Sequence, residues 1–380
     1  MRILIALTYY RPHVSGLTVY GERLARGLAA RGHQVTVLTS RFASSLPARE
    51  LMDGVDVIRV PVLAKVSKGV VMPLFPLYAA ALVRRHDVVN IHMPQFEAAL
   101  LALLGRLCRR GVVITYQCDL QLPAGSFNRL VQASLVPLNN AAAKAAHAIV
   151  VMTDDYARHS AFLSRYTAKL RTIPALIDSP PPDAGLAAQL AQGWGLNGHR
   201  RIGFAARWAA EKGVEFLLRA LPRVLETCPD ARIVFTGAYK NTIGEEAYRQ
   251  RLEPLLQQHR SRLILLDLLQ PETMPSYFAL CDVLAVTSVN STESFGLVQA
   301  EAMLAGTPVV TTDLPGVRAA VQETGMGLIV PPRNAEALAD ALVEILRDRP
   351  RFVRPRDAVA AHFAFGAALE QYETLFSGLR

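Results

Sequence analysis

Short apolar runs alternate with amphipathic stretches along the first half of the chain. The apolar runs predict buried strands at residues 2–8, 33–39, 55–60, 87–93, 111–117 and 146–153. Between the first two, apolar side chains recur at helical spacing, so residues 16–32 are predicted to form a helix that ends at Gly32. Continuous apolar strands alternating with helices are typical of a parallel sheet covered on both faces. We therefore predict an α/β domain over residues 1–177.

A proline-rich segment interrupts this alternation. Residues 177–185 read IDSPPPDAG, and three consecutive prolines cannot continue a helix or a central strand. Residues 178–190 are therefore predicted to be a semi-rigid linker.

The alternation restarts after the linker and predicts a second α/β domain over residues 191–357. Its expected strands cover residues 201–207, 231–237, 262–269, 282–288 and 307–313. An amphipathic helix is expected over residues 358–380. The predicted fold class is thus α/β, with two doubly wound Rossmann-like domains. Ligands bind at the carboxyl ends of such strands, so we expect the site in a cleft between the two domains.

Composition narrows the class of protein. Of the 380 residues, 51% are hydrophobic and 19% are charged, which is typical of a folded globular chain. The formal net charge of +9 favours anionic partners. The four cysteines form no C-x-x-C pair, so structural zinc and a disulfide framework are not expected, and a reducing cytosol fits best. The opening MRILIALTYY is interpreted as a buried strand, and no apolar run of ~18 residues predicts a membrane span.

The charge and the fold suggest two other classes of protein, but the chain lacks the motifs of both. A nucleic-acid binder is disfavoured because the chain has no arginine–aromatic stripe or recognised binding module. A dinucleotide-dependent dehydrogenase is disfavoured because no G-x-G-x-x-G follows the first strand.

The first candidate site is the loop after the first strand, YYRPHVSG at residues 9–16. Pro12 and His13 stiffen this loop, and Ser15 and Gly16 lie where the next helix begins. The free N–H groups of a helix start can receive an anion. A strand–glycine–helix turn also occurs as a simple packing turn, and both interpretations stay open.

The second candidate is FAARWAAEKG, residues 204–213. Arg207 leaves the end of a strand, and Lys212 comes just before Gly213 and a helix. A planar guanidinium and a compact ammonium together suit a diphosphate. The alternative is a pair of solvated basic side chains in a basic protein.

The third candidate is ESFGLVQAEAML, residues 293–304. Glu293 precedes a Ser294-Phe295-Gly296 turn, Leu297 begins a helix, and Glu301 lies about one turn into it. A carboxylate at that place can accept two hydrogen bonds from a vicinal diol such as a ribose. The alternative is an acidic residue favoured by the helix dipole and a solvated glutamate, but Glu301 lies in a stretch expected to be buried.

Taken together, YYRPHVSG…LARGLAARGHQVTVLT, AARWAAEKG and ESFGLVQAEAMLAGTPVV resemble family 4 retaining glycosyltransferases of the two-domain GT-B fold. The resemblance covers essentially the whole chain, and its most specific part is the E-x7-E stretch followed by AGTPVV. It implies a hexosyltransferase that takes a nucleotide-diphosphate sugar, UDP- or GDP-linked in preference to ADP-linked, with no cofactor. The chain has no D-x-D motif, in agreement with a metal-independent site.

The resemblance also implies roles for particular residues. Glu301 would hold the ribose and Glu293 the donor sugar, while Arg207 and Lys212 would neutralise the diphosphate. The donor would also be contacted by the stretches around these residues, namely Ser15, Gly16, Asp267, Leu268, Ser294, Phe295, Gly296 and Leu297, with backbone as far as Gln270 framing the base. The terminal helix would return to the first domain through Tyr372.

The acceptor side departs from the family pattern. The family usually has two glycines where this chain has Ser15-Gly16, and many members have a histidine at the position of Gln117. Glutamine can donate a hydrogen bond to a sugar oxygen but takes no proton at neutral pH. His13, His92, Gln117 and Asp119 are the acceptor-side candidates, and Gln117 and Asp119 are also candidates for a catalytic role. If the protein must supply a base, Asp119 and His92 are nearest by strand-end position; a hydrogen-bonded strand-end role for His92 and a turn-capping role for Asp119 stay open. Gln117 also keeps open a catalytically silent relative that binds a nucleotide sugar or a partner.

One segment suggests contact with a membrane surface. Residues 63–86 combine Lys65, Lys68, Arg84 and Arg85 with apolar residues that look exposed. The segment could rest on an anionic membrane, as in resembling enzymes with lipid-linked acceptors, or could be an amphipathic helix beside the acceptor site. The expected location is cytoplasmic, with possible peripheral contact at the inner membrane face, and the expected pathway is polysaccharide or lipid-linked glycan synthesis.

Overall fold

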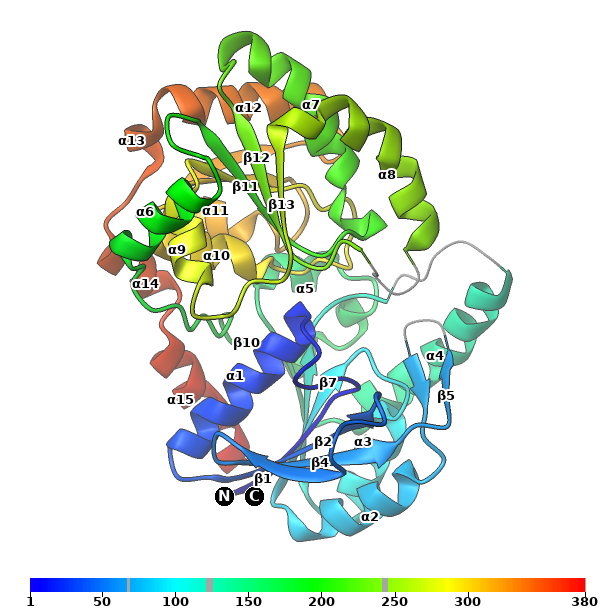
Figure 1. Cartoon of the computed structure of the whole chain (residues 1–380). Helices are drawn as coiled ribbons and strands as arrows, with labels where there is room; N and C mark the ends of the chain where they lie inside the picture. The colour runs from blue at the N-terminus through cyan, green and yellow to red at the C-terminus, as the bar shows by residue number, and fades with distance from the viewer. Residues whose placement is uncertain (67–68, 121–125, 241–244, 380) are drawn as a thin grey trace. The chain divides into compact units, whose positions relative to one another are not determined.

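The computed structural model describes residues 1–66, 69–120, 126–240 and 245–379 (Figure 1). The chain forms two compact units. Unit 1 comprises Met1–Leu176 and Phe365–Arg380, and unit 2 comprises Ile177–Ala364. Among the described residues, no helix is both long and apolar enough to cross a membrane.

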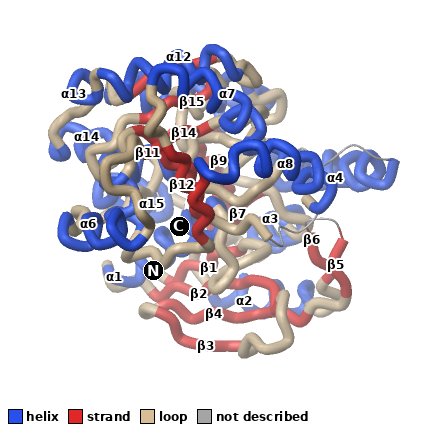
Figure 2. The backbone as a smooth tube through the Cα atoms, turned by 45° about the horizontal axis from the view of Figure 1, so that its top comes forward, coloured by secondary structure: helices blue, strands red, loops and turns tan. Residues whose placement is uncertain are grey.

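Unit 1 is built on an eight-stranded sheet in the order β10-β9-β8-β7-β1-β2-β4-β3. Every pairing is parallel except the one between β3 and β4, and β3 lies at the edge of the sheet (Figure 2). All six strands predicted for this part are present. The strands are β1 (Arg2–Ala6), β2 (Gln34–Arg41), β3 (Arg49–Met52), β4 (Val55–Pro61), β7 (Val88–Met93), β8 (Gly111–Tyr116), β9 (Ala148–Val151) and β10 (Leu170–Thr172). A separate hairpin pairs β5 (Ala64–Val66) with β6 (Gly69–Val71).

Helices cover this sheet and bury a core of aliphatic side chains. They are α1 (Gly16–Ala30), α2 (Phe75–Arg85), α3 (Ala98–Leu107), α4 (Ser126–Ala145), α5 (Asp154–His159) and α15 (Phe365–Ser377). Helix α1 begins where Ser15 accepts a hydrogen bond from the backbone N–H of Thr18, as expected of a serine N-cap. The helix ends before Gly32, whose φ of +84° a glycine adopts without strain.

The terminal helix α15 packs beside α1 in unit 1 (Figure 1). The buried hydroxyl of Tyr372 lies 3.0 Å from that of Tyr20 and 3.2 Å from Oγ1 of Thr115. Asn90 in turn donates to the same Thr115 oxygen at 2.8 Å. This chain of hydrogen bonds satisfies polar groups that would otherwise be costly to bury.

The single helix expected over residues 358–380 is in fact two helices. Helix α14 (Arg356–His362) belongs to unit 2, and α15 begins at Phe365 in unit 1. The break falls at Phe363, whose φ of −121° and ψ of 38° are not helical. The Phe363 ring is buried edge-on against Phe295, with centroids 6.1 Å apart, which anchors the chain at this point.

Unit 2 contains an all-parallel sheet in the order β13-β12-β11-β14-β15-β16. The five predicted strands are present, and a sixth, β16, was not predicted. The strands are β11 (Arg201–Ala205), β12 (Arg232–Thr236), β13 (Leu263–Leu266), β14 (Val283–Val286), β15 (Val309–Thr312) and β16 (Gly327–Val330). The helices are α6 (Ala184–Gly193), α7 (Val214–Thr227), α8 (Glu246–His259), α9 (Met274–Leu280), α10 (Leu297–Leu304), α11 (Ala319–Thr324), α12 (Ala335–Arg347), α13 (Arg349–Phe352) and α14.

The predicted linker, residues 178–190, extends too far. Helix α6 begins at Ala184, directly after the prolines, and the Asp183 side chain caps it by accepting from the N–H of Leu186 at 3.0 Å. The Ser276 hydroxyl of α9 accepts a hydrogen bond from the backbone N–H of Asp183 and donates one to the Asp183 carbonyl, both at 3.2 Å. These bonds attach the start of α6 to α9, and the segment is part of unit 2.

Candidate active site

The loop after β11 presents Arg207 at the carboxyl edge of the unit 2 sheet. Trp208 is buried, and its ring packs on Phe235 and Tyr239 with centroids 5.5 and 5.2 Å away. The backbone N–H of Trp208 donates to the carbonyl of Ala238 at 2.9 Å. With Trp208 fixed inside, the neighbouring Arg207 side chain is directed outward and is partly exposed.

The same loop then passes very close to the end of β14. Thr287 Oγ1 donates to the carbonyls of Lys212 and Gly213 at 2.7 and 3.1 Å. Gly213 has a φ of +61°, and a Cβ at this position would lie 2.3 Å from the carbonyl oxygen of Thr287. Only glycine fits this approach, which brings Lys212 next to the loop after β14.

Each of the two predicted cations has a carboxylate partner. Lys212 Nζ contacts the carboxylate of Glu293, which also accepts from Ser288 Oγ at 3.4 Å. The Arg207 guanidinium pairs with Glu211. The Glu293 and Glu211 side chains are only 16% and 12% exposed, so both pairs are partly shielded from water.

The turn before α10 is built as the sequence suggested. Ser294 and Phe295 are buried, and Gly296 opens the helix with a φ of +76°. Buried Gln299 fixes the turn by donating from Nε2 to the carbonyl of Phe295 and, at 2.8 Å, to that of Val317. No side chain caps the helix start, which begins at Leu297.

Glu301 lies in the middle of α10 and is half-buried, while its neighbours Ala300 and Ala302 are fully buried. The stretch is therefore buried as expected, but the glutamate itself keeps access to water.

Asp267 and Leu268 follow β13 at the same edge of the sheet. Thr236 Oγ1 donates to the Asp267 carbonyl at 3.1 Å, and Lys240 reaches the Asp267 carboxylate at 3.3 Å. Leu268 is 52% exposed. Because parallel strands end at one edge, β13, β11 and β14 place Asp267, Arg207 and Glu293 along a single rim of unit 2.

In unit 1 the loop after β1 is held by a buried arginine. Arg59 of β4 pairs with Glu50 and donates to the carbonyl of Arg11 at 2.9 Å. The His13 ring stacks on Tyr9 with centroids 4.7 Å apart.

Ser15 and Gly16 close this loop in different ways. The Ser15 hydroxyl is used as the N-cap of α1. A Cβ on Gly16 would meet, among the described residues, no heavy atom within 4 Å other than those of its chain neighbours and its own helix. The backbone around Gly16 is therefore open to an approaching group.

His92 and Gln117 form a buried pair at the ends of β7 and β8. Gln117 Nε2 lies 3.3 Å from His92 Nδ1, and the imidazole lies edge-on to Tyr20 with centroids 6.1 Å apart. Burial lowers the pKa of His92 to about 3, because an imidazolium would lose its hydration there. His92 therefore fits the strand-end interpretation and not that of a general base.

Asp119 is occupied by bonds within its own loop. Its carboxylate accepts from Tyr116 at 2.8 Å and from Ser160 at 2.7 Å, and its N–H donates to the Tyr156 hydroxyl at 2.6 Å. The structure favours the turn-capping interpretation of this residue.

Two acidic residues at these strand ends escaped the sequence analysis. Glu211 could have been found, because it lies four residues after Arg207 in a segment that leads into a helix. Glu97 follows β7 at the N-terminus of α3, where burial raises the pKa of its carboxyl to about 7. Its sequence context, EAALLALL, offers no signal beyond an ordinary acidic helix start.

Comparison with known proteins adds the decisive observation. Residues 15–175 match the model of a glycosyl transferase 4-like domain, and residues 199–348 match that of the glycosyl transferases group 1. The chain belongs to the group 1, family 4 glycosyltransferases.

Relatives and solved structures agree over the length of this glycosyltransferase. An uncharacterised glycosyltransferase of Methanocaldococcus jannaschii is 26% identical, covering 92% of the chain and 90% of the relative. A GDP-mannose-dependent α-(1-6)-phosphatidylinositol monomannoside mannosyltransferase of Mycobacterium tuberculosis is 25% identical, covering 93% and 91%. Sucrose-phosphate synthase of Thermosynechococcus elongatus superposes with a TM-score of 0.79 at 23% identity, covering 100% and 98%. Anabaena HepE in complex with UDP-glucose gives 0.74 at 19% identity, covering 100% and 98%.

These findings identify the glycosyltransferase as a transferase enzyme with the GT-B fold. Within its second unit, the structure brings Lys212 and Glu293 into contact and aligns them with Arg207 and Asp267 on one rim. Two cations on a rigid loop can neutralise an anionic leaving group. In its first unit, the predicted acceptor-side residues His92 and Gln117 are buried, whereas His13 and Asp119 are partly exposed.

Proposed function

We propose that this glycosyltransferase is a retaining hexosyltransferase. It moves a hexose from a nucleotide-diphosphate sugar to a glycan or lipid-linked acceptor and needs no metal. The nucleotide sugar is supported by the UDP-glucose complex of HepE and by the GDP-mannose dependence in the name of the mycobacterial relative. These two names favour UDP or GDP over ADP as the carrier.

The donor binds at the rim of unit 2 in this proposal. Arg207 and Lys212 hold the diphosphate, Glu301 accepts hydrogen bonds from the ribose, and Glu293 orients the transferred sugar. The backbone around Asp267 and Leu268 frames the base. The observation that carries the proposal is the contact of Lys212 with Glu293, because it joins an anion-binding cation to a sugar-binding carboxylate at one point.

In this proposal the two ion pairs are the contacts that Arg207 and Lys212 make when no substrate is bound. A diphosphate carries more negative charge than one carboxylate, and an arginine can bind its oxygens through two parallel hydrogen bonds. Arg207 and Lys212 thus exchange Glu211 and Glu293 for phosphate. Glu293, released from Lys212, is then available to a sugar hydroxyl.

Transfer with retention requires no base from the protein. The bond between the anomeric carbon and the phosphate oxygen breaks, and the two cations stabilise the charge that develops on the diphosphate. The acceptor hydroxyl attacks from the same face and gives its proton to the departing phosphate. The low pKa of buried His92 and the bonded state of Asp119 are consistent with this scheme.

Unit 1 binds the acceptor, and its surface supports contact with a membrane. Leu63 and Leu77 are 74% and 69% exposed, and Arg84 and Arg85 end the same α2 helix that carries Leu77. Lys68, also assigned to this surface, lies outside the described residues. Exposed apolar side chains and arginines on the same helix suit an anionic lipid surface. We place the enzyme in the cytoplasm, at the inner membrane face, in polysaccharide or lipid-linked glycan synthesis. A purified protein that does not bind anionic liposomes at low salt would contradict the proposed membrane contact.

Titration with UDP and GDP, followed by assay of sugar transfer or slow donor hydrolysis, tests the proposed function. Glu301→Ala removes hydrogen bonds to a charged acceptor, each worth about 1.5–3 kcal/mol, so affinity for the preferred diphosphate should fall by roughly 10-fold or more. Glu336→Ala, at an exposed glutamate in the first turn of α12, is the matched control and should bind normally. Unchanged affinity in Glu301→Ala would contradict the ribose role.

A further inference from the structure

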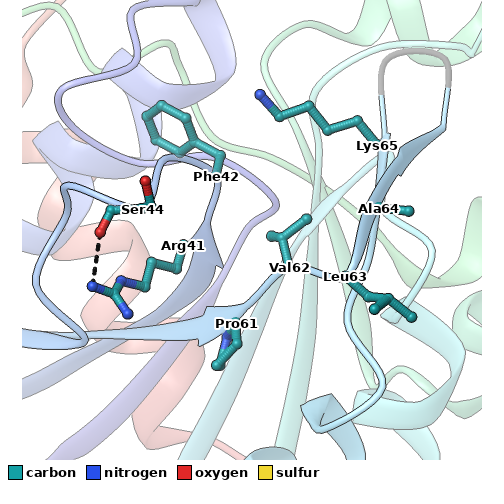
Figure 3. Close-up of a pocket in the computed structure, with 8 residues that line it drawn as sticks. All are labelled: Arg41, Phe42, Ser44, Pro61, Val62, Leu63, Ala64 and Lys65. Atoms are coloured by element: carbon teal, nitrogen blue, oxygen red, sulfur yellow. Dashed lines mark hydrogen bonds between the residues drawn. The ribbon is translucent and has the colours of Figure 1, made fainter.

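Two surface features of unit 1 have no part in the proposed donor site. One is a hollow of about 330 Å³ between the loops that carry Phe42 and Lys65, at the carboxyl ends of β2 and β4 (Figure 3). Its two cations do not converge, because the Arg41 guanidinium donates to the carbonyl of Ser44 at 2.9 Å and is directed away from Lys65. The Phe42 ring lies edge-on to Tyr9, with centroids 5.6 Å apart, so the hollow adjoins the loop after β1.

The other feature is the outer surface of helix α3. The sequence of this helix is AALLALLGRL, in which Arg106 is the one polar residue. Helix α3 lies between α2 and α4 in the helical layer of unit 1 (Figure 1). A helix that covers a sheet usually turns polar side chains to water, and a helix that is apolar all round is usually buried on every side. The composition of α3 therefore indicates a second partner besides the sheet.

The side of α3 that faces the sheet carries mostly small residues. Ala98, Leu101, Ala102 and Gly105 are buried there. A Cβ on Gly105 would lie 2.5 Å from Cγ2 of Val112 on β8, so the helix packs closely on the strands. The larger apolar side chains of the helix are thus left for its other side.

That other side presents a row of leucines. Leu100, Leu103, Leu104 and Leu107 recur at intervals of three and four residues, so they share one face of the helix. Leu103 and Leu107 are 54% and 80% exposed, and Leu100 and Leu104 are partly exposed beside them. We call these four residues the α3 face. A contiguous exposed apolar patch of this kind marks an interaction surface.

The spacing of the α3 face is self-complementary. Two copies of the helix can pack antiparallel about a two-fold axis that passes between Leu103 and Leu104. Leu100 of one copy then lies opposite Leu107 of the second copy, and Leu103 lies opposite Leu104. A two-fold interface requires this reciprocity, in which the same patch on both copies pairs with itself.

The charges at the ends of α3 favour the same orientation. Glu97 stands at the start of the helix, whereas Arg106, Arg109 and Arg110 stand at its end. Antiparallel packing brings the acidic start of one copy toward the basic end of the other, whereas parallel packing brings the two basic ends together. An anionic membrane would match the basic end alone.

We propose that the α3 face is the interface of a homodimer, in which two α3 helices pack antiparallel about a two-fold axis. Each copy covers the leucines of the other. Val136 and Leu138 of the neighbouring helix α4, 49% and 40% exposed, add apolar surface to the same layer. The dimer goes beyond the proposed function and does not depend on it, because the donor rim lies in unit 2.

Sedimentation velocity of the full-length protein over a wide range of concentration tests the dimer. Wild type is compared with Leu107→Glu and with Leu51→Glu. Leu51 is the matched control, because it is 77% exposed in the same unit but lies on the edge strand β3. Circular dichroism and UDP binding show whether each variant is folded, and the binding of phosphatidylcholine vesicles that contain phosphatidylglycerol is measured in parallel.

Wild type should form a reversible dimer. Leu107→Glu should raise the dissociation constant of the dimer about tenfold or more, because each copy loses a buried leucine and places a carboxylate in an apolar contact. Leu51→Glu should dimerise as wild type does, and UDP should bind all three proteins equally. A wild type that stays monomeric, or an equal weakening in the two variants, overturns the proposal. A monomer whose vesicle binding is lost in Leu107→Glu also overturns it and gives the α3 face to a membrane.

Disulfide cross-linking tests the orientation. Cys108 ends the helix and is partly exposed, so every cross-linking variant also carries Cys108→Ser. Mild oxidation of a mixture of Leu100→Cys and Leu107→Cys should give a covalent dimer of the two variants, identified by mass, in excess over either variant alone. Cross-linking of each variant chiefly with itself would show parallel helices and contradict the two-fold antiparallel interface.

Discussion

The two units share a plan and differ at their strand ends. Both are parallel or largely parallel sheets covered by helices, and in both a glycine opens the helix after the first central strand, Gly16 in unit 1 and Gly213 in unit 2. In unit 2 the glycine is enclosed by the end of β14, and the cations beside it are each paired with a carboxylate. In unit 1 the glycine is open, and aromatic rings line the neighbouring loop.

This difference indicates what each edge is built to hold. A tightly packed loop with fixed charges suits a ligand whose charges lie at the same points in every turnover, and in the proposed function that ligand is the diphosphate of the donor. An open loop with aromatic rings and one hollow suits acceptors of varied shape. The same sheet architecture thus suits two kinds of ligand in the two units, and the strand-end loops decide between them.

The largest effect should come from the cations of unit 2. Arg207→Ala combined with Lys212→Ala removes both charges that are proposed to stabilise the leaving diphosphate, so turnover should fall by about 10³-fold or more. Arg260→Ala, at an exposed arginine of the same unit, should have no effect. The assay is sugar transfer or donor hydrolysis, with circular dichroism to show that the fold is intact. A double variant that keeps its activity would place the diphosphate elsewhere.

The second prediction compares the two glycines directly. Gly213→Ala forces a Cβ to within 2.3 Å of the Thr287 carbonyl at a positive φ, and it should destabilise the protein by about 2–4 kcal/mol. Gly16→Ala places a Cβ where no described residue outside the local chain comes within 4 Å, so it should leave the unfolding free energy within about 0.5 kcal/mol of the wild type. Urea unfolding of both variants measures the contrast. Equal effects would show that the two loops are not packed differently.

The smallest effect concerns the neutral histidine of unit 1. The folded state keeps His92 unprotonated down to about pH 3, whereas the unfolded chain protonates it below about 6.5. Its contribution to stability is therefore complete above pH 6.5 and is lost as the pH falls toward 3, by up to about 1.4 kcal/mol per pH unit.

The matching variant is His92→Gln, which should show a shallower fall in unfolding free energy between pH 6.5 and 4 than the wild type. Glu97 acts in the opposite direction, because burial raises its pKa to about 7, but it is present in both proteins and cancels in the difference. Parallel pH profiles for the two proteins would mean that His92 is accessible to protons in the folded state.

Much of the fold could be predicted from the sequence, and the reason is burial. Strands covered on both faces read as continuous apolar runs, so the central strands of both sheets were found. The edge strand β3 was missed because RELM is largely exposed and carries no such run. Helix α6 was missed because the three prolines dominated the interpretation of the residues that follow them.

The candidate site was predictable only in part. The Arg207–Glu211 pair follows from a separation of four residues, but Lys212 and Glu293 are 81 residues apart and meet only because Thr287 holds the loop at Gly213. His92 looked accessible at a strand end, but the Tyr20 ring and the side of Gly21 from helix α1 cover it. The hollow at Phe42 and Lys65 lies between two loops, and nothing in either sequence indicates that the two meet.

The central claim is that a diphosphate takes the place of two carboxylates at the rim of unit 2. A crystal structure of the protein with UDP or GDP tests it most directly. The account predicts phosphate oxygens within hydrogen-bonding distance of Arg207 and Lys212, with the pairs to Glu211 and Glu293 opened and the ribose hydroxyls on Glu301. A nucleotide bound elsewhere, with both ion pairs intact, would contradict it.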